Sequence, residues 1–156
     1  MNELLVRLLQ RDDPHEDLFD AYDGTLELLA HAGDGAGDTL LLEPVLRRFE
    51  FALLDALGYG FPLDVDLSGA PVLAKASYHV LPDRGVIAAE DASMLLDGDG
   101  GTEPVSGDAL LAIAAGRLDS GARLRLAKAI TRAALAPHLG ARPLVARSLF
   151  SARRRS

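Results

Sequence analysis

The stretch LEPVLRRFEFALLDALGYG, residues 42–60, decides the fold of this chain. Its large apolar side chains recur every three or four residues, the spacing that brings side chains onto one face of an α-helix. These side chains are Leu42, Val45, Leu46, Phe49, Leu53 and Leu57. Gly58-Tyr59-Gly60 follows the last of them and supplies a helix stop. The stretch therefore predicts a long helix with one buried face.

Helical spacing continues on both sides of this stretch. We expect a first helix that begins at the N-terminus and a second over about residues 14–31. The second helix would bury the face formed by Leu18, Tyr22, Leu26 and Leu29. Downstream, helices are predicted between Ser106, an N-cap candidate, and Gly116, over about residues 121–139, and briefly after Pro143.

Residues 61–107 interrupt the helical pattern with four prolines and a glycine-rich run. Within them, Ser77–Leu81 and Gly85–Ala88 flank Pro82-Asp83-Arg84, which predicts a small β-hairpin with a short loop. The expected fold class is therefore mainly α. We expect a helical bundle over residues 1–156, forming one domain, with a β-hairpin insertion at about residues 61–107.

Composition narrows the class of protein. The chain has 156 residues, of which 49% are hydrophobic, enough to form one core. It has no cysteine, which excludes disulfides, thiolate metal sites and cysteine nucleophiles. The N-terminal residues lack a basic region followed by an apolar stretch, and no apolar run approaches the roughly 18 residues of a membrane span. We therefore expect a cytoplasmic protein without membrane contact.

The net charge of −7 conceals a division between two parts of the chain. Residues 1–108 hold 6 Lys and Arg against 22 Asp and Glu, a balance of −16, whereas residues 109–156 hold 10 against 1, a balance of +9. This division indicates a basic surface that meets an acidic partner. Packing of basic helices beside acidic ones within the chain is an equally good explanation.

No pattern of catalytic, metal-binding or cofactor-binding residues stands out. The histidines, scattered without the spacing of a metal or general-base site, are His15, His31, His79 and His138. Residues 97–108 resemble a calcium loop only in part, because Gly101 and Thr102 occupy positions that need a ligand and a turn glycine. We therefore expect no enzymatic activity, no cofactor and no metal.

Two groups of basic residues are candidates for binding a partner. The first group, spaced by three and four residues and so sharing one helix face, is Arg125, Lys128 and Arg132. A solvated charged face is the plain alternative for these three. The second group, Arg47 and Arg48, lies in the long helix between Leu46 and Phe49. A guanidinium beside an apolar seam suits a carboxylate that lies next to a hydrophobic anchor.

Three segments of the chain carry a family resemblance. They are Asn2-Glu3-Leu4-Leu5, the stretch from Leu46-Arg47-Arg48-Phe49-Glu50 to Gly58-Tyr59-Gly60, and Leu139-Gly140-Ala141-Arg142-Pro143-Leu144-Val145-Ala146-Arg147. In order and spacing they resemble the RecO family of recombination mediators, over essentially the whole chain. The resemblance implies the helical C-terminal domain of such a protein, without the family's N-terminal OB-fold. It also implies a zinc-finger-like insertion, whose two cysteine pairs are replaced here by residues 66–69 and 88–91, leaving a degenerate, zinc-less version.

The resemblance further implies a function in DNA repair and recombination. RecO proteins bind and anneal DNA, bind the acidic C-terminal tail of the single-stranded-DNA-binding protein, and act with RecR to load RecA in the RecF pathway. We therefore expect a nucleoid-associated module with these partners and weak DNA binding of its own. The alternatives are a stand-alone, non-specific nucleic-acid-binding helical protein and an inert truncated fragment.

The expected site residues combine the resemblance, which implicates positions 47 and 125, with the charge pattern. The residues expected to bind the partner are Arg47, Arg125, Lys128, Arg132, Leu46, Phe51 and Leu54. The residues expected to contact nucleic acid are Arg142, Arg147, Arg153, Arg154 and Arg155.

Overall fold

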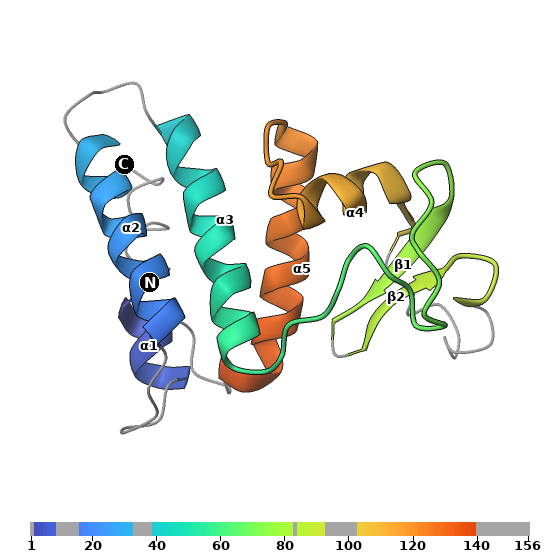
Figure 1. The fold of residues 1–156 in the computed structure, drawn as a ribbon, viewed down its shortest axis with the longest axis horizontal. Coiled ribbons are helices and arrows are strands. Elements are labelled where there is room, and N and C mark those ends of the chain that lie inside the picture. Colours follow the sequence, from blue (N-terminus) through green and yellow to red (C-terminus); the bar gives the residue numbers. More distant parts are fainter. Residues whose placement is uncertain (1, 9–15, 33–38, 83, 93–102, 140–156) are drawn as a thin grey trace, which may run out of the picture.

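The computed structural model describes residues 2–8, 16–32, 39–82, 84–92 and 103–139. Its elements in chain order are α1 (Asn2–Leu8), α2 (Glu16–Ala32), α3 (Thr39–Ala56), β1 (Ser77–Leu81), β2 (Gly85–Ala88), β3 (Val105–Ser106), α4 (Gly107–Ala114) and α5 (Gly121–Leu139). Figure 1 shows α2, α3 and α5 side by side, with α4 between them and the small sheet. The prediction of a mainly α protein with a β insertion is confirmed. The short helix expected after Pro143 lies outside the described residues.

The long helix predicted from residues 42–60 is α3, and it lies at the centre of the helical part (Figure 1). The middle of its predicted apolar face is buried, since Phe49 is 1% exposed and Leu53 is 0% exposed. These side chains belong to one apolar cluster with Leu4 of α1, Leu18 of α2 and Leu135 of α5. Burial of such side chains stabilises the fold by about 1.5–3 kcal/mol each, so this cluster holds the helices together.

Helix α2 departs from its predicted packing. Leu26, which we expected on the buried face, is 41% exposed, whereas Leu18 and Thr25 are buried. The Thr25 hydroxyl donates a hydrogen bond of 2.6 Å to a backbone carbonyl one turn earlier in the helix. Because α2 stands at the end of the row in Figure 1 and packs chiefly against α3, only a narrow strip of its surface is covered. The side chain of Leu29 lies outside the described residues.

The predicted hairpin is present, with β1 and β2 antiparallel and Leu81 paired with Gly85 at the loop. The third strand, β3, pairs with the other edge of β1, so the sheet order is β2-β1-β3. Sequence periodicity does not predict β3, because a two-residue strand shows no alternation. Helix α4 follows β3 directly, and its predicted N-cap is confirmed. The Ser106 side chain accepts a hydrogen bond of 3.3 Å from the Ala109 amide.

A second apolar cluster joins the insertion to α4 and α5. Its buried members include Leu63, Val72, Tyr78, Val80 and Val86 from the insertion, Leu110 and Ile113 from α4, and Ala127 and Ile130 from α5. Helix α5 therefore packs against α3 with one face and against the insertion with another. Phe61, in the connection that leaves α3, packs against both clusters. This connection is where the helical part and the insertion meet.

Candidate functional site

The two adjacent arginines of α3 serve different surfaces. Successive residues of an α-helix point about 100° apart, so Arg47 and Arg48 cannot face the same neighbour. Arg47 is buried at 7% exposure on the side of α3 that faces α5. It pairs with Glu50, whose carboxylate accepts a hydrogen bond from Thr131 of α5. Arg48 is exposed and reaches the end of α4, where its Nη2 donates a hydrogen bond of 3.2 Å to the carbonyl oxygen of Gly116. The sequence pattern did not distinguish these two roles.

Charged and polar side chains line the contact between α3 and α5. We call this group the polar seam; its members are Glu43, Arg47, Glu50, Lys128 and Thr131. Arg47 Nη1 lies 2.7 Å from Glu50 Oε2, and the Thr131 hydroxyl donates to that same carboxylate oxygen. At the edge of the seam, Lys128 Nζ lies 3.1 Å from Glu43 Oε1. The seam thus joins two helices that are far apart in the chain.

Burial governs the electrostatics of this seam. Loss of solvent raises the pKa of the Glu50 carboxyl, and the hydrogen bond from Thr131 and the charges of Arg47 and Lys128 oppose that rise. Arg47 Nε is buried and has no hydrogen-bond partner among the residues that the structure describes. Holding a ligand through Arg47 Nη1 would break its ion pair with the half-buried Glu50 carboxylate, which is costly in a site with little solvent. Arg47 therefore contributes to the fold in this structure.

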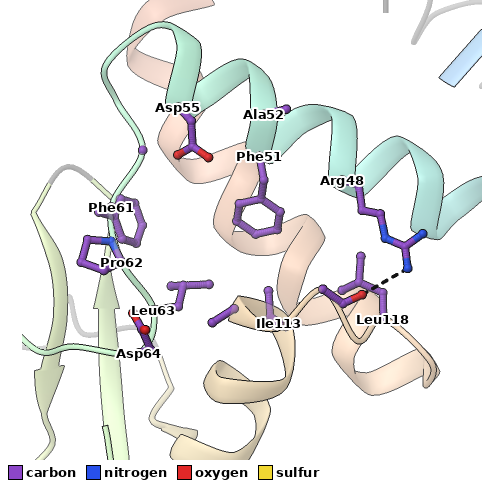
Figure 2. A pocket seen from close by; sticks show the side chains of 13 residues that line it. Arg48, Phe51, Ala52, Asp55, Phe61, Pro62, Leu63, Asp64, Ile113 and Leu118 are labelled. Carbon is purple, nitrogen blue, oxygen red and sulfur yellow. Dashed lines mark hydrogen bonds between the residues drawn. The ribbon is translucent and has the colours of Figure 1, made fainter. Parts of the chain in front are cut away.

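A pocket opens on the other side of α3, between this helix, the connection leaving it and α4. We call it the α3–α4 pocket; its volume is about 630 Å³. It is lined by Arg48, Phe51, Ala52, Asp55, Gly60, Phe61, Pro62, Leu63, Asp64, Ile113, Ala114, Gly116 and Leu118. Figure 2 shows Phe51 pointing from α3 into the pocket, with Leu63 and Ile113 below it. The middle of the pocket is therefore apolar.

The two ends of this pocket carry opposite charges. In Figure 2, Arg48 lies at one end, whereas Asp55 and Asp64 lie at the other. Partial burial raises the pKa of the Asp55 carboxyl. The Arg48 guanidinium has five N–H donors, of which the bond to Gly116 uses one. Such a site can hold an apolar group in its middle and a carboxylate at the Arg48 end.

The structure separates the residues that we predicted to bind a partner. Phe51 lines the pocket, whereas Leu54 is 2% exposed in the apolar core and Leu46 is half-buried. Arg125 and Arg132 are exposed on one face of α5, beside Lys128 of the seam. Their assignment as partner-binding residues stays a prediction. The predicted nucleic-acid contacts at positions 142, 147, 153, 154 and 155 lie outside the described residues.

The sequence pattern named Arg48 and Phe51 as candidates, but it did not predict the pocket that they line, although α3 carries a signal for it. Arg48, Phe51, Ala52 and Asp55 are spaced by three, four and seven residues, so they share one helix face. A cation, two apolar residues and an acid on one face describe the wall of the pocket. Because Arg48 was grouped with Arg47 beside the apolar face, this second face of the helix was not recognised.

Comparison with known proteins places this chain in a family. Residues 1–148 match the family model described as "Recombination protein O C terminal". The chain belongs to the RecO family. It is 44% identical over 156 residues to the DNA repair protein RecO of Pseudomonas aeruginosa (strain LESB58), covering 100% of this chain and 60% of that relative. Against the RecO protein of Stutzerimonas stutzeri it is 44% identical over 152 residues, covering 96% of this chain and 57% of the relative.

The RecO relatives are longer than the chain described here. A RecO protein from Thiobacillus denitrificans, 42% identical over 152 residues, has 56% of its length covered by 96% of this chain. The chain thus spans somewhat more than half the length of the curated relatives that it matches. The names of these relatives refer to DNA repair, and none refers to an enzymatic activity. In the described part of the chain, no helix is both long and apolar enough to cross a membrane.

Proposed function

We propose that this chain is a non-enzymatic, protein-binding module of a DNA repair and recombination mediator, and that it binds the acidic C-terminal tail of the single-stranded-DNA-binding protein. RecR is the second partner in this proposal, and this chain and RecR together promote DNA annealing and RecA loading. Membership of the RecO family supports the general role, and the names of the relatives agree with it.

The observation that carries the proposal is an arginine at the end of an apolar pocket. In RecO proteins, as the resemblance implies, the bound tail is an acidic segment that ends in an apolar residue with a free carboxylate. A guanidinium holds a carboxylate through two parallel hydrogen bonds, and Arg48 retains donors for this contact. The terminal apolar side chain would enter the pocket between Phe51 and Ile113. The pocket therefore matches both features of the end of the tail.

The geometry supports Arg48 better than Arg47 as the residue that holds the tail. Arg47 is buried and engaged with Glu50, so binding a carboxylate would require breaking an ion pair of 2.7 Å. Arg48 is exposed and bonded only to a backbone carbonyl, which leaves its charge uncompensated by a carboxylate among the described residues. Binding through Arg48 requires no such rearrangement of the core.

A titration of a fluorescently labelled tail peptide tests this assignment. We expect Arg48→Ala to weaken binding by about 1–3 kcal/mol, the scale of a hydrogen bond to a charged group. Amidation of the peptide's C-terminus should weaken binding to the parent by a similar factor and to Arg48→Ala much less. Arg117→Ala is the matched control, because Arg117 is exposed beside Gly116 but does not line the pocket. Unchanged binding to Arg48→Ala would move the site elsewhere.

The exposed face of α5 supports a second contact in the same function. Arg125 and Arg132 stand on one face of this helix, and Lys128 between them is held by Glu43. Exposed arginines that are not held by carboxylates attract acidic peptides and nucleic-acid phosphates alike. If Arg125→Ala and Arg132→Ala weaken tail binding while Arg48→Ala does not, the tail lies on α5.

A further inference from the structure

The connection between α3 and β1 contains a tight turn that two short arms close. Val65 and Pro71 form an antiparallel bridge, and the amide of Val72 donates a hydrogen bond of 2.8 Å to the carbonyl of Asp64. Inside these pairs, the amide of Asp66 donates 2.8 Å to a carbonyl across the turn. We call residues 64–72 the Asp66 turn. Its arms are held in register by backbone hydrogen bonds, and at its tip the Gly69 amide donates 2.9 Å to the Asp66 carbonyl, to which the Asp66 side chain adds further bonds.

One carboxylate oxygen gathers the tip of this turn. Asp66 Oδ1 accepts a hydrogen bond of 2.6 Å from the Ser68 hydroxyl, one of 2.9 Å from the Ser68 amide and one of 3.0 Å from the Ala70 amide. Three donors therefore converge on a single acceptor. The anionic oxygen therefore closes the tip of a turn that has no apolar core of its own.

The residues around the turn do not fit a metal. The family resemblance implies zinc bound by two cysteine pairs at residues 66–69 and 88–91, and this chain contains no cysteine. A structural zinc site needs four ligands, and the described residues contain no cluster of three or more His, Cys, Asp or Glu. Asp66, the one candidate ligand in the first of these segments, already points its Oδ1 at three donors.

The turn leads directly to a wall of the α3–α4 pocket. Leu63, which precedes the turn, and Asp64, its first residue, line that pocket. Leu63, just before the turn, and Val72, its last residue, are each 5% exposed in the same apolar cluster. The turn is also fastened to β2, because the Leu67 amide donates 2.8 Å to the carbonyl of Val86. The turn is therefore continuous with the residues that line the pocket.

We propose that Asp66 replaces a metal as the group that closes this turn, and that it is thereby a positioning residue for the Leu63–Asp64 wall of the α3–α4 pocket. Its effect on peptide binding rests on the proposed function, whereas closure of the turn does not. The proposal distinguishes this chain from a metal-closed insertion, in which a chelator would open the turn.

Amide hydrogen exchange on the whole chain tests the closure. We expect Asp66→Ala to accelerate exchange at the Ser68 and Ala70 amides about fivefold or more, the scale of losing a hydrogen bond. Asp66→Asn retains a side-chain oxygen acceptor and should restore most of the protection. Glu90→Ala, an exposed carboxylate elsewhere in the insertion, is the matched control. A chelator should leave the parent unchanged. Parental exchange rates in Asp66→Ala, or a chelator that accelerates exchange in the parent, would overturn the proposal.

Two further readouts test the positioning role. The methyl resonances of Leu63 should shift in Asp66→Ala and return in Asp66→Asn, while exchange in α5 stays at parental rates. The tail peptide should bind Asp66→Ala at least threefold more weakly than Glu90→Ala. Unmoved Leu63 resonances would refute positioning even if the turn opens. If the parent binds no tail peptide, the proposed function fails, and the exchange and methyl data still decide the role of Asp66.

Discussion

Truncation of Arg47 is expected to damage the fold, whereas truncation of its neighbour Arg48 is not. In Arg47→Ala, the Glu50 carboxylate loses its ion pair while its side chain, 15% exposed, remains in the seam. Removing one partner of a buried pair costs about 3–5 kcal/mol. We expect the lower end, about 3 kcal/mol, because the Thr131 hydroxyl still donates to Glu50. Arg48→Ala removes one exposed hydrogen bond, to Gly116, and should cost less than about 1 kcal/mol.

Urea unfolding followed by circular dichroism measures this difference. For an m-value of about 2 kcal/mol/M, a loss of 3 kcal/mol lowers the midpoint by about 1.5 M. A double-mutant cycle identifies the cause. If the unpaired carboxylate is responsible, the variant that combines Arg47→Ala with Glu50→Ala loses less stability than the sum of the single variants.

Two results would refute this reasoning. The first result is that Arg47→Ala and Arg48→Ala have the same unfolding midpoint within experimental error. It would mean that the buried pair adds nothing to stability. Strict additivity in the cycle would mean that Arg47 and Glu50 do not interact in solution. In either case Arg47 would again be available to bind the partner, as the sequence pattern suggested.

The remaining predictions concern pH, packing and salt. The hydrogen bond from Ser68 lowers the pKa of the Asp66 carboxyl in the folded protein. The stability that the ionised carboxylate adds is therefore complete above the unfolded-state pKa of about 3.9 and is lost as pH falls through the lower folded-state pKa. Between pH 7 and pH 3, urea unfolding should show a smaller loss of stability for Asp66→Asn than for the parent, and equal losses would contradict this prediction. A Cβ at Gly107 would lie 2.0 Å from a backbone carbonyl oxygen of the insertion. Gly107→Ala should therefore lower the free energy of unfolding by about 1–3 kcal/mol, measured by thermal unfolding. A Tm equal to that of the parent would show that the contact relaxes. If the exposed face of α5 contacts phosphates, single-stranded-DNA binding should weaken steeply as salt rises. Arg125→Ala and Arg132→Ala should each reduce the slope of log affinity against log salt concentration by roughly 0.7. An unchanged slope would exclude this face.

Much of the local structure could be predicted from sequence because it depends on neighbours within a few residues. The spacing of apolar residues located α3, and the Ser106 cap located the start of α4. The hairpin strands occur at the predicted residues 77–81 and 85–88, since alternating residues and a proline-containing turn act locally. Local patterns did not decide how much of a helix is covered. Leu26 is exposed because α2 stands at the end of the row, a fact that no window of its own sequence contains.

The sequence by itself determined that two arginines lie beside the apolar face of one helix. Only the tertiary structure decided which of them is buried and which is available. Glu50 meets Thr131 across 81 residues of sequence, and this contact places α5 against the side of α3 that bears Arg47. The end of α4 then lies beside Arg48, whose guanidinium bonds Gly116 across 68 residues. Helical periodicity gives each side chain its direction, but the element that it meets depends on packing between distant segments, and packing turns one arginine into core and leaves its neighbour at the rim of a pocket.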